Sequence, residues 1–160
     1  MAARFLTPLR LHLLHEWDGW RPKWVLLEPL RYWSDVANRE IVVRPGFVFD
    51  GESSPIYGAI TGPVCFHAGA LHDWLYGTHE LTKDVADAVY EEAMRAVGLD
   101  PFYADQRYRM VSDYGGGAYE SGPVRFRMLD LAELQKDEPY GALAAAPPAP
   151  VVPPAPSDGP

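Results

Sequence analysis

The chain has 160 residues, of which 48% are hydrophobic and 12% aromatic, so it can fold as one domain around a hydrophobic core. Its 22 acidic and 14 basic residues give a formal net charge of −8 at pH 7. Nucleic-acid binding depends on basic side chains that neutralise phosphates, so this charge excludes nucleic acid as an expected partner. A single cysteine, Cys65, excludes an intrachain disulfide.

The sequence predicts neither a transmembrane segment nor a secretory signal peptide. No stretch approaches the roughly 18 consecutive apolar residues that a membrane-spanning helix needs. Near the N-terminus, the apolar run is interrupted by His12, His15 and Glu16, and no cleavage site of small residues follows it.

The first third of the chain has the pattern of β-strands. Leu9, Leu11 and Leu13 alternate with Arg10 and His12, as in a strand with one buried face. Further apolar runs follow at 23–28, 30–33 and 41–43, and turn residues at 18–19 and 34–38 separate them. We predict an antiparallel meander, which is a sheet of three or four strands with one covered face.

The rest of the folded part has the pattern of helices. We predict helices over 64–76, from the N-cap Thr82 to about 97, and from Asp100 to the glycines at 115–117. Gly77 is expected to end the first helix, and Gly98 stands where a C′ glycine belongs in the second. In the third, Asp100 is an N-cap followed by proline at the first helical position. A short strand over 124–129 is expected to return to the sheet.

From about residue 137 the composition changes to mostly alanine and proline. Such a segment cannot bury enough apolar surface to order itself, so we predict a disordered tail over 137–160. The expected architecture is one α+β domain over residues 1–136. It consists of an N-terminal antiparallel β-meander packed on three α-helices.

His72 and Asp73 are adjacent inside an otherwise apolar predicted helix, where each is costly to bury without a partner. If the first two helices pack antiparallel through their apolar faces, His72 can meet Asp87. A carboxylate on one imidazole nitrogen fixes the tautomer and raises the basicity of the other nitrogen, as in a general base. The alternative is a core hydrogen bond between His72 and Asp87, with Tyr76 as an ordinary core residue.

A metal site is the second possibility in this region. Asp73 points about 100° away from His72 on the helix, so it can bind a cation without competing for the same proton. Asp50 lies in the loop 46–55, just before the helix. Together Asp50 and Asp73 would offer oxygen ligands, which suit calcium, magnesium or manganese better than zinc. The alternative for Asp50 is that it caps its own turn.

These residues also resemble a known family. Three blocks carry the resemblance: Val43-x-Pro45-Gly46-Phe47-x-x-Asp50-x-x-Ser53-x-Pro55, then His72-Asp73-x-Leu75-Tyr76, then Ala86-Asp87 with Met94. They resemble the phage and prophage family named domain of unknown function 1353, over roughly Leu9 to Tyr114. The family has no firm activity, so the resemblance implies a bacteriophage setting. The expected location is the host cytoplasm or the phage virion, with other virion proteins or the host envelope as partners.

A second similarity supplies a mechanism. His-Asp-x-x-Tyr on one helix, answered by Asp on an antiparallel helix, is similar to the phospholipase A2 centre. By that similarity His72 activates a water, Asp73 ligates calcium, and Asp87 and Tyr76 orient His72. The chain departs from those enzymes in having no disulfides and no glycine-rich calcium loop, for which only the segment 50–62 could substitute.

Two functions of different class follow from these patterns. The first is a metal-assisted, phospholipase-like hydrolase of a host-envelope ester, with calcium as the expected cation and magnesium or manganese as alternatives. The second is a non-catalytic virion or assembly component, associated with the phage head or tail. The two functions differ in whether water can reach His72.

Overall fold

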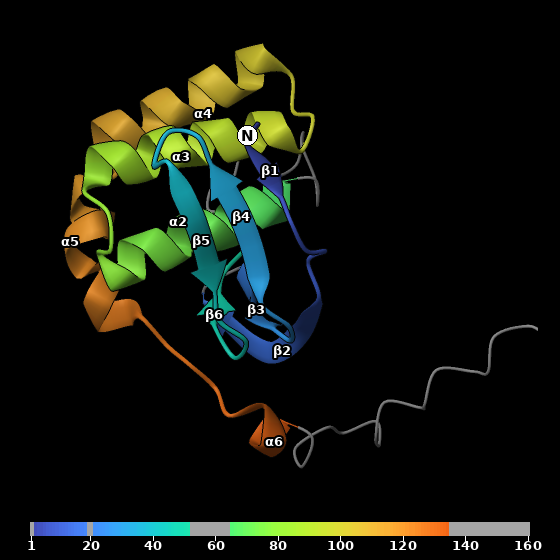
Figure 1. The fold of residues 1–160 in the computed structure, drawn as a ribbon. Helices are drawn as coiled ribbons and strands as arrows, with labels where there is room; N and C mark the ends of the chain where they lie inside the picture. The colour runs from blue at the N-terminus through green and yellow to red at the C-terminus, as the bar shows by residue number, and fades with distance from the viewer. Residues whose placement is uncertain (1, 19–20, 52–64, 135–160) are drawn as a thin grey trace, which may run out of the picture.

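The predicted α+β class is confirmed: strands occupy the first part of the chain and helices the second (Figure 1). The computed structural model describes residues 2–18, 21–51 and 65–134. The predicted tail over 137–160, the domain boundary before it and part of the turn at 18–19 lie outside these residues. No helix in the described part of the chain is long and apolar enough to cross a membrane.

The strands form two three-stranded antiparallel sheets instead of the single sheet that was expected. One sheet has the order β1-β4-β5 and the other β2-β3-β6. Pro29 stands between β3 and β4 and has no backbone N–H to donate to a sheet, so the run of apolar residues there is divided. The strands are β1 (Arg4–Phe5), β2 (Leu11–Asp18), β3 (Arg21–Leu26), β4 (Leu30–Ser34), β5 (Arg39–Val43) and β6 (Val48–Phe49).

The alternation expected along β2 is wrong from Leu13 onward. Leu13 is exposed, whereas Leu14 is buried and packs with Val25 and Val48. The pairing of β2 with β3 shifts register between Leu13 and Trp17. Such an irregularity changes which side chains face the core.

Two of the predicted helices begin and end where the sequence indicates. The structure has α2 (Phe66–Thr78), α3 (Lys83–Ala96), α4 (Pro101–Tyr114), α5 (Gly116–Arg125) and α6 (Leu131–Leu134). Thr82 is the N-cap residue of α3, and Gly98 beyond its end has a φ of 87°. The Asp100 side chain accepts a hydrogen bond from the Phe102 N–H, 2.9 Å away, at the start of α4.

Two helix predictions at glycines and one strand prediction are wrong. Gly77 lies inside α2, where a Cβ atom would collide with the Phe126 ring, so this glycine serves packing instead of ending the helix. The glycines at 115–117 lead directly into α5, which was not expected. Because α5 continues to Arg125, the strand predicted over 124–129 is reduced to an isolated bridge between Met128 and Phe47.

Helix α2 is central to the molecule, and most of its residues are buried. It packs against α3 and α5, and α4 lies on the other side of α3 (Figure 1). At the crossing with α5, the backbone carbonyl of Tyr76 lies so close to Gly122 that no Cβ atom would fit there. The side chains of α2 are therefore held between helices on two sides.

The turn between β4 and β5 is fastened to α3 by Glu92. Its carboxylate accepts hydrogen bonds from the Tyr32 hydroxyl at 3.0 Å and the Ser34 hydroxyl at 2.7 Å. It also accepts bonds from the backbone N–H groups of Asp35 and Val36, both at 3.0 Å. Burial, together with the charge of Glu92, raises the pKa of Tyr32 and keeps its hydroxyl protonated as a donor.

We expect Glu92→Ala to lower the free energy of unfolding by about 2–4 kcal/mol, because four donors lose a charged acceptor. Urea-induced unfolding measures the change. Glu91→Ala is the matched control on the same helix: its exposed i,i+4 pair with Arg95 is worth less than about 0.5 kcal/mol. Equal effects of the two substitutions would contradict this role for Glu92.

We also expect opposite effects from two alanine substitutions in α5. Gly122→Ala forces a methyl group against the backbone of α2 and should destabilise the fold by about 2–3 kcal/mol. Gly117→Ala meets open space within a helix and should stabilise it by up to about 1 kcal/mol. Thermal unfolding of both variants tests the sign of each change.

Candidate functional site

The buried carboxylate of Asp87 organises the predicted site. Asp87 is 1% exposed. Its Oδ1 atom lies 3.1 Å from Nε2 of His72 and accepts a 2.6 Å hydrogen bond from the Tyr76 hydroxyl. The expected packing of the first two helices is therefore observed, and it brings His72, Tyr76 and Asp87 together.

Lys83 is a further member of this network that the sequence reasoning missed. Its Nζ donates to Oδ2 of Asp87 at 2.7 Å. It also donates to the backbone carbonyls of Val111 at 2.8 Å and Ser112 at 3.0 Å, near the end of α4. The signal was present as the i,i+4 spacing of Lys83 and Asp87 on α3.

The network keeps Asp87 ionised. Burial alone would raise the pKa of Asp87, but hydrogen bonds from His72, Lys83 and Tyr76 hold the pKa below its usual value. Burial and the bond to Asp87 raise the pKa of Tyr76, so its hydroxyl stays a donor. An ionised Asp87 can only accept, so a neutral His72 carries its proton on Nε2, and Nδ1 is then the basic nitrogen.

Aromatic rings enclose His72. Its imidazole packs against Tyr76 with ring centroids 4.0 Å apart and against Tyr90 at 4.4 Å. Only 9% of the His72 side chain is exposed. The ring orientation is therefore fixed by contacts with two aromatic rings as well as by Asp87.

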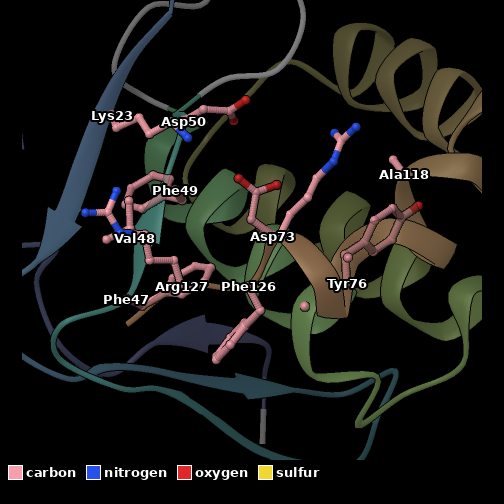
Figure 2. A pocket seen from close by; sticks show the side chains of 13 residues that line it. Lys23, Phe47, Val48, Phe49, Asp50, Asp73, Tyr76, Ala118, Phe126 and Arg127 are labelled. Atoms are coloured by element: carbon pink, nitrogen blue, oxygen red, sulfur yellow. The ribbon is translucent and has the colours of Figure 1, made fainter. Parts of the chain in front are cut away.

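A cavity of about 650 Å³ lies beside this network (Figure 2). Asp50, Asp73 and Tyr76 line it, whereas His72 and Asp87 do not. Tyr76 thus belongs both to the cavity wall and to the network behind it. The other lining residues are Lys23, Phe47, Val48, Phe49, Gly77, Ala118, Gly122, Arg125, Phe126 and Arg127.

The two predicted cation ligands come from different elements. Asp50 follows β6, and Asp73 is on α2, one turn after Gly69 (Figure 2). A Cβ atom at Gly69 would lie 2.9 Å from the carbonyl oxygen of Gly51, so glycine lets the chain after β6 lie directly on α2. Gly51 itself has a φ of 78°, which favours glycine.

The donor set fits a hard cation only in part. Asp50 and Asp73 both line the cavity and offer carboxylate oxygens, the ligand type that calcium or magnesium requires. Within residues 2–18, 21–51 and 65–134, no three His, Cys, Asp or Glu side chains are grouped as metal ligands. The remainder of the segment 50–62 that was expected to replace a calcium loop lies outside the described residues.

The chain matches one protein-family model, described as Protein of unknown function (DUF1353), over residues 24–111. This match covers slightly more than half of the chain and includes His72, Tyr76 and Asp87. No curated protein and no solved structure matches the chain.

We expect Asp87→Asn to lower the free energy of unfolding at pH 7 by about 3 kcal/mol, because the network loses its buried anion. Since the pKa of Asp87 is lowered by folding, its contribution is present above the unfolded pKa near 4 and is lost as pH falls through the folded pKa. Wild type and Asp87→Asn should therefore converge in stability at strongly acidic pH.

Urea unfolding at a series of pH values measures this convergence. Asp84→Asn, an exposed substitution in the first turn of α3, is the control and should cost less than about 1 kcal/mol. A stability difference between wild type and Asp87→Asn that stays constant down to the acid limit would contradict the assignment.

Proposed function

The chain belongs to the DUF1353 family, and from its site we propose that this member is a metal-assisted hydrolase that cleaves an ester of the host envelope. We further propose a bacteriophage or prophage origin and a phospholipase-like centre, as the sequence resemblances imply. The observation that carries the proposal is the Asp87 carboxylate, which binds His72 Nε2 and the Tyr76 hydroxyl through the same oxygen.

In this proposal His72 is the general base. Asp87 holds the proton of the neutral ring on Nε2, which directs Nδ1 to accept a proton from water. Asp87 also stabilises the imidazolium that forms, because it remains ionised. Tyr76 holds Asp87 in place through its hydroxyl, and its ring packs against His72.

Asp73 and Asp50 are the proposed cation ligands, since their carboxylates line one cavity. A bound calcium ion, or magnesium or manganese in its place, would polarise the ester carbonyl. The cavity also has the aromatic side chains of Phe47, Phe49 and Phe126, which suit the apolar part of an ester.

Access of water to His72 is the physical requirement of this function. The imidazole is not on the cavity wall, but its chain neighbour Asp73 and its ring neighbour Tyr76 are. The 9% of the side chain that is exposed is the surface at which a hydrolytic water would have to arrive.

A non-catalytic role as a virion or assembly component is the second candidate. Helix α4 leaves three large apolar side chains exposed, Phe102, Met110 and Tyr114. Exposed apolar side chains on one helix favour contact with another protein. Co-purification of the folded protein with phage particles, without any ester hydrolysis, would support this role over the catalytic one.

We expect His72→Gln to lower kcat for ester hydrolysis by about 10³-fold, because glutamine can still donate to Asp87 but cannot act as a base. The assay measures fatty-acid release from phosphatidylglycerol vesicles with calcium, magnesium, manganese or EDTA. EDTA and Asp73→Asn should each abolish turnover.

His15→Gln, on the exposed side of β2, is the matched control and should retain wild-type activity. Thermal unfolding shows whether each variant is folded. A folded His72→Gln variant with wild-type turnover, or a wild-type protein inactive with every cation, would reject the hydrolase.

A further inference from the structure

Three basic side chains line the cavity, and they differ in their pairing. Arg127 forms a bidentate ion pair with Glu16, in which one of the two hydrogen bonds is a 3.0 Å bond to Oε1. The charge of Arg127 is therefore already neutralised. This bond lowers the pKa of Glu16. Lys23 and Arg125 form no hydrogen bond or ion pair with any residue in the described ranges, although the charge of Lys23 also contributes to lowering the pKa of Glu16.

The fold fixes the backbone positions of Lys23 and Arg125, and the Arg125 residue is exposed. Lys23 is on β3, next to Trp24, which pairs with Phe49 of β6. Arg125 is the last residue of α5, three residues after Gly122, where α5 lies against the backbone of α2. The two cations therefore approach one cavity from two different elements.

Among the described residues, two cations on one cavity without a hydrogen-bonded or ion-paired partner are unexpected in a protein with a net charge of −8. The overall field of such a protein repels anions, so an anionic ligand needs positive side chains close to it. If Asp50 and Asp73 hold a cation, as the proposed function requires, Lys23 and Arg125 are left to bind an anion. Aromatic residues that line the same cavity, including Phe47 and Phe126, would contact an apolar group of the ligand.

We propose that Lys23 and Arg125 form a subsite for the phosphate group of an amphiphilic ester. This inference rests on the proposed function for the ester, but the subsite can be tested without catalysis. Lys23 supplies a compact ammonium, and Arg125 a guanidinium that can donate two parallel hydrogen bonds to phosphate oxygens.

The test is calorimetric titration with a short-chain phosphatidylglycerol that has ether links in place of esters, in the presence of calcium. This ligand cannot be hydrolysed, so binding is measured apart from turnover. We expect the double variant Lys23→Gln/Arg125→Gln to bind it at least about tenfold more weakly than wild type. The control is Arg44→Gln/Arg109→Gln, which removes the same charge from exposed positions outside the cavity and should stay within about twofold.

Two further ligands identify what is recognised. The matching diether glycerol without phosphate should bind wild type and the Lys23/Arg125 variant equally. Glycerol 3-phosphate, the phosphate without the chains, should bind wild type at least about tenfold more weakly than the lipid, because it lacks the apolar contacts.

The outcomes separate the two proposals. Equal binding of the phospholipid to wild type and the Lys23/Arg125 variant overturns the subsite, whatever the hydrolysis assay shows. If glycerol 3-phosphate binds as tightly as the lipid, the proposal that the ligand is amphiphilic is rejected, and the result points to a free phosphate ester. Selective binding of the phospholipid without hydrolysis of its ester form supports the subsite and rejects the hydrolase.

Discussion

The arrangement of the helices depends on one buried negative charge, that of Asp87, which must be paired. The Asp87 carboxylate is withdrawn from water, so it must receive hydrogen bonds or lose its charge. Its donors are His72 and Tyr76 on α2 and Lys83 on its own helix. Lys83 also binds the carbonyls at the end of α4. Pairing this one anion therefore fixes three helices relative to each other.

The hydrogen bonds of this network are those that a structural centre and a reactive centre would both require. Three donors keep Asp87 ionised, and an ionised Asp87 sets the tautomer of His72. A protein with a purely structural network would have these features as well. Beside the network lies the cavity, which Tyr76 joins to it and which Asp73 and Asp50 also line.

Local signals in the sequence predicted the parts of the fold that local physics determines. The N-cap Asp100 and the glycine at 98 define helix ends through their own backbone and side chains, and they were correctly placed. Gly77 and Gly122 do not define a helix end or a turn. They allow α2 to lie close to α5 and to the residue that follows it, which the local sequence does not predict. The pairing of His72 with Asp87 followed from helical periodicity, whereas the cavity required knowledge of how distant segments pack.

The two-residue strand β6 has a consequence for how the cavity forms during synthesis. Strand β6 pairs with β3 on one side. On the other side, the backbone N–H of Val48 donates to the carbonyl of Arg127, and the N–H of Leu129 donates to the carbonyl of Gly46. A nascent chain of which only the two sheets and α2 have left the ribosome therefore has Lys23, Asp50 and Asp73. It still lacks the part of the cavity lining that residues 118–127 supply. The ribosome must therefore extend the chain past Leu129 before this side of the cavity can close.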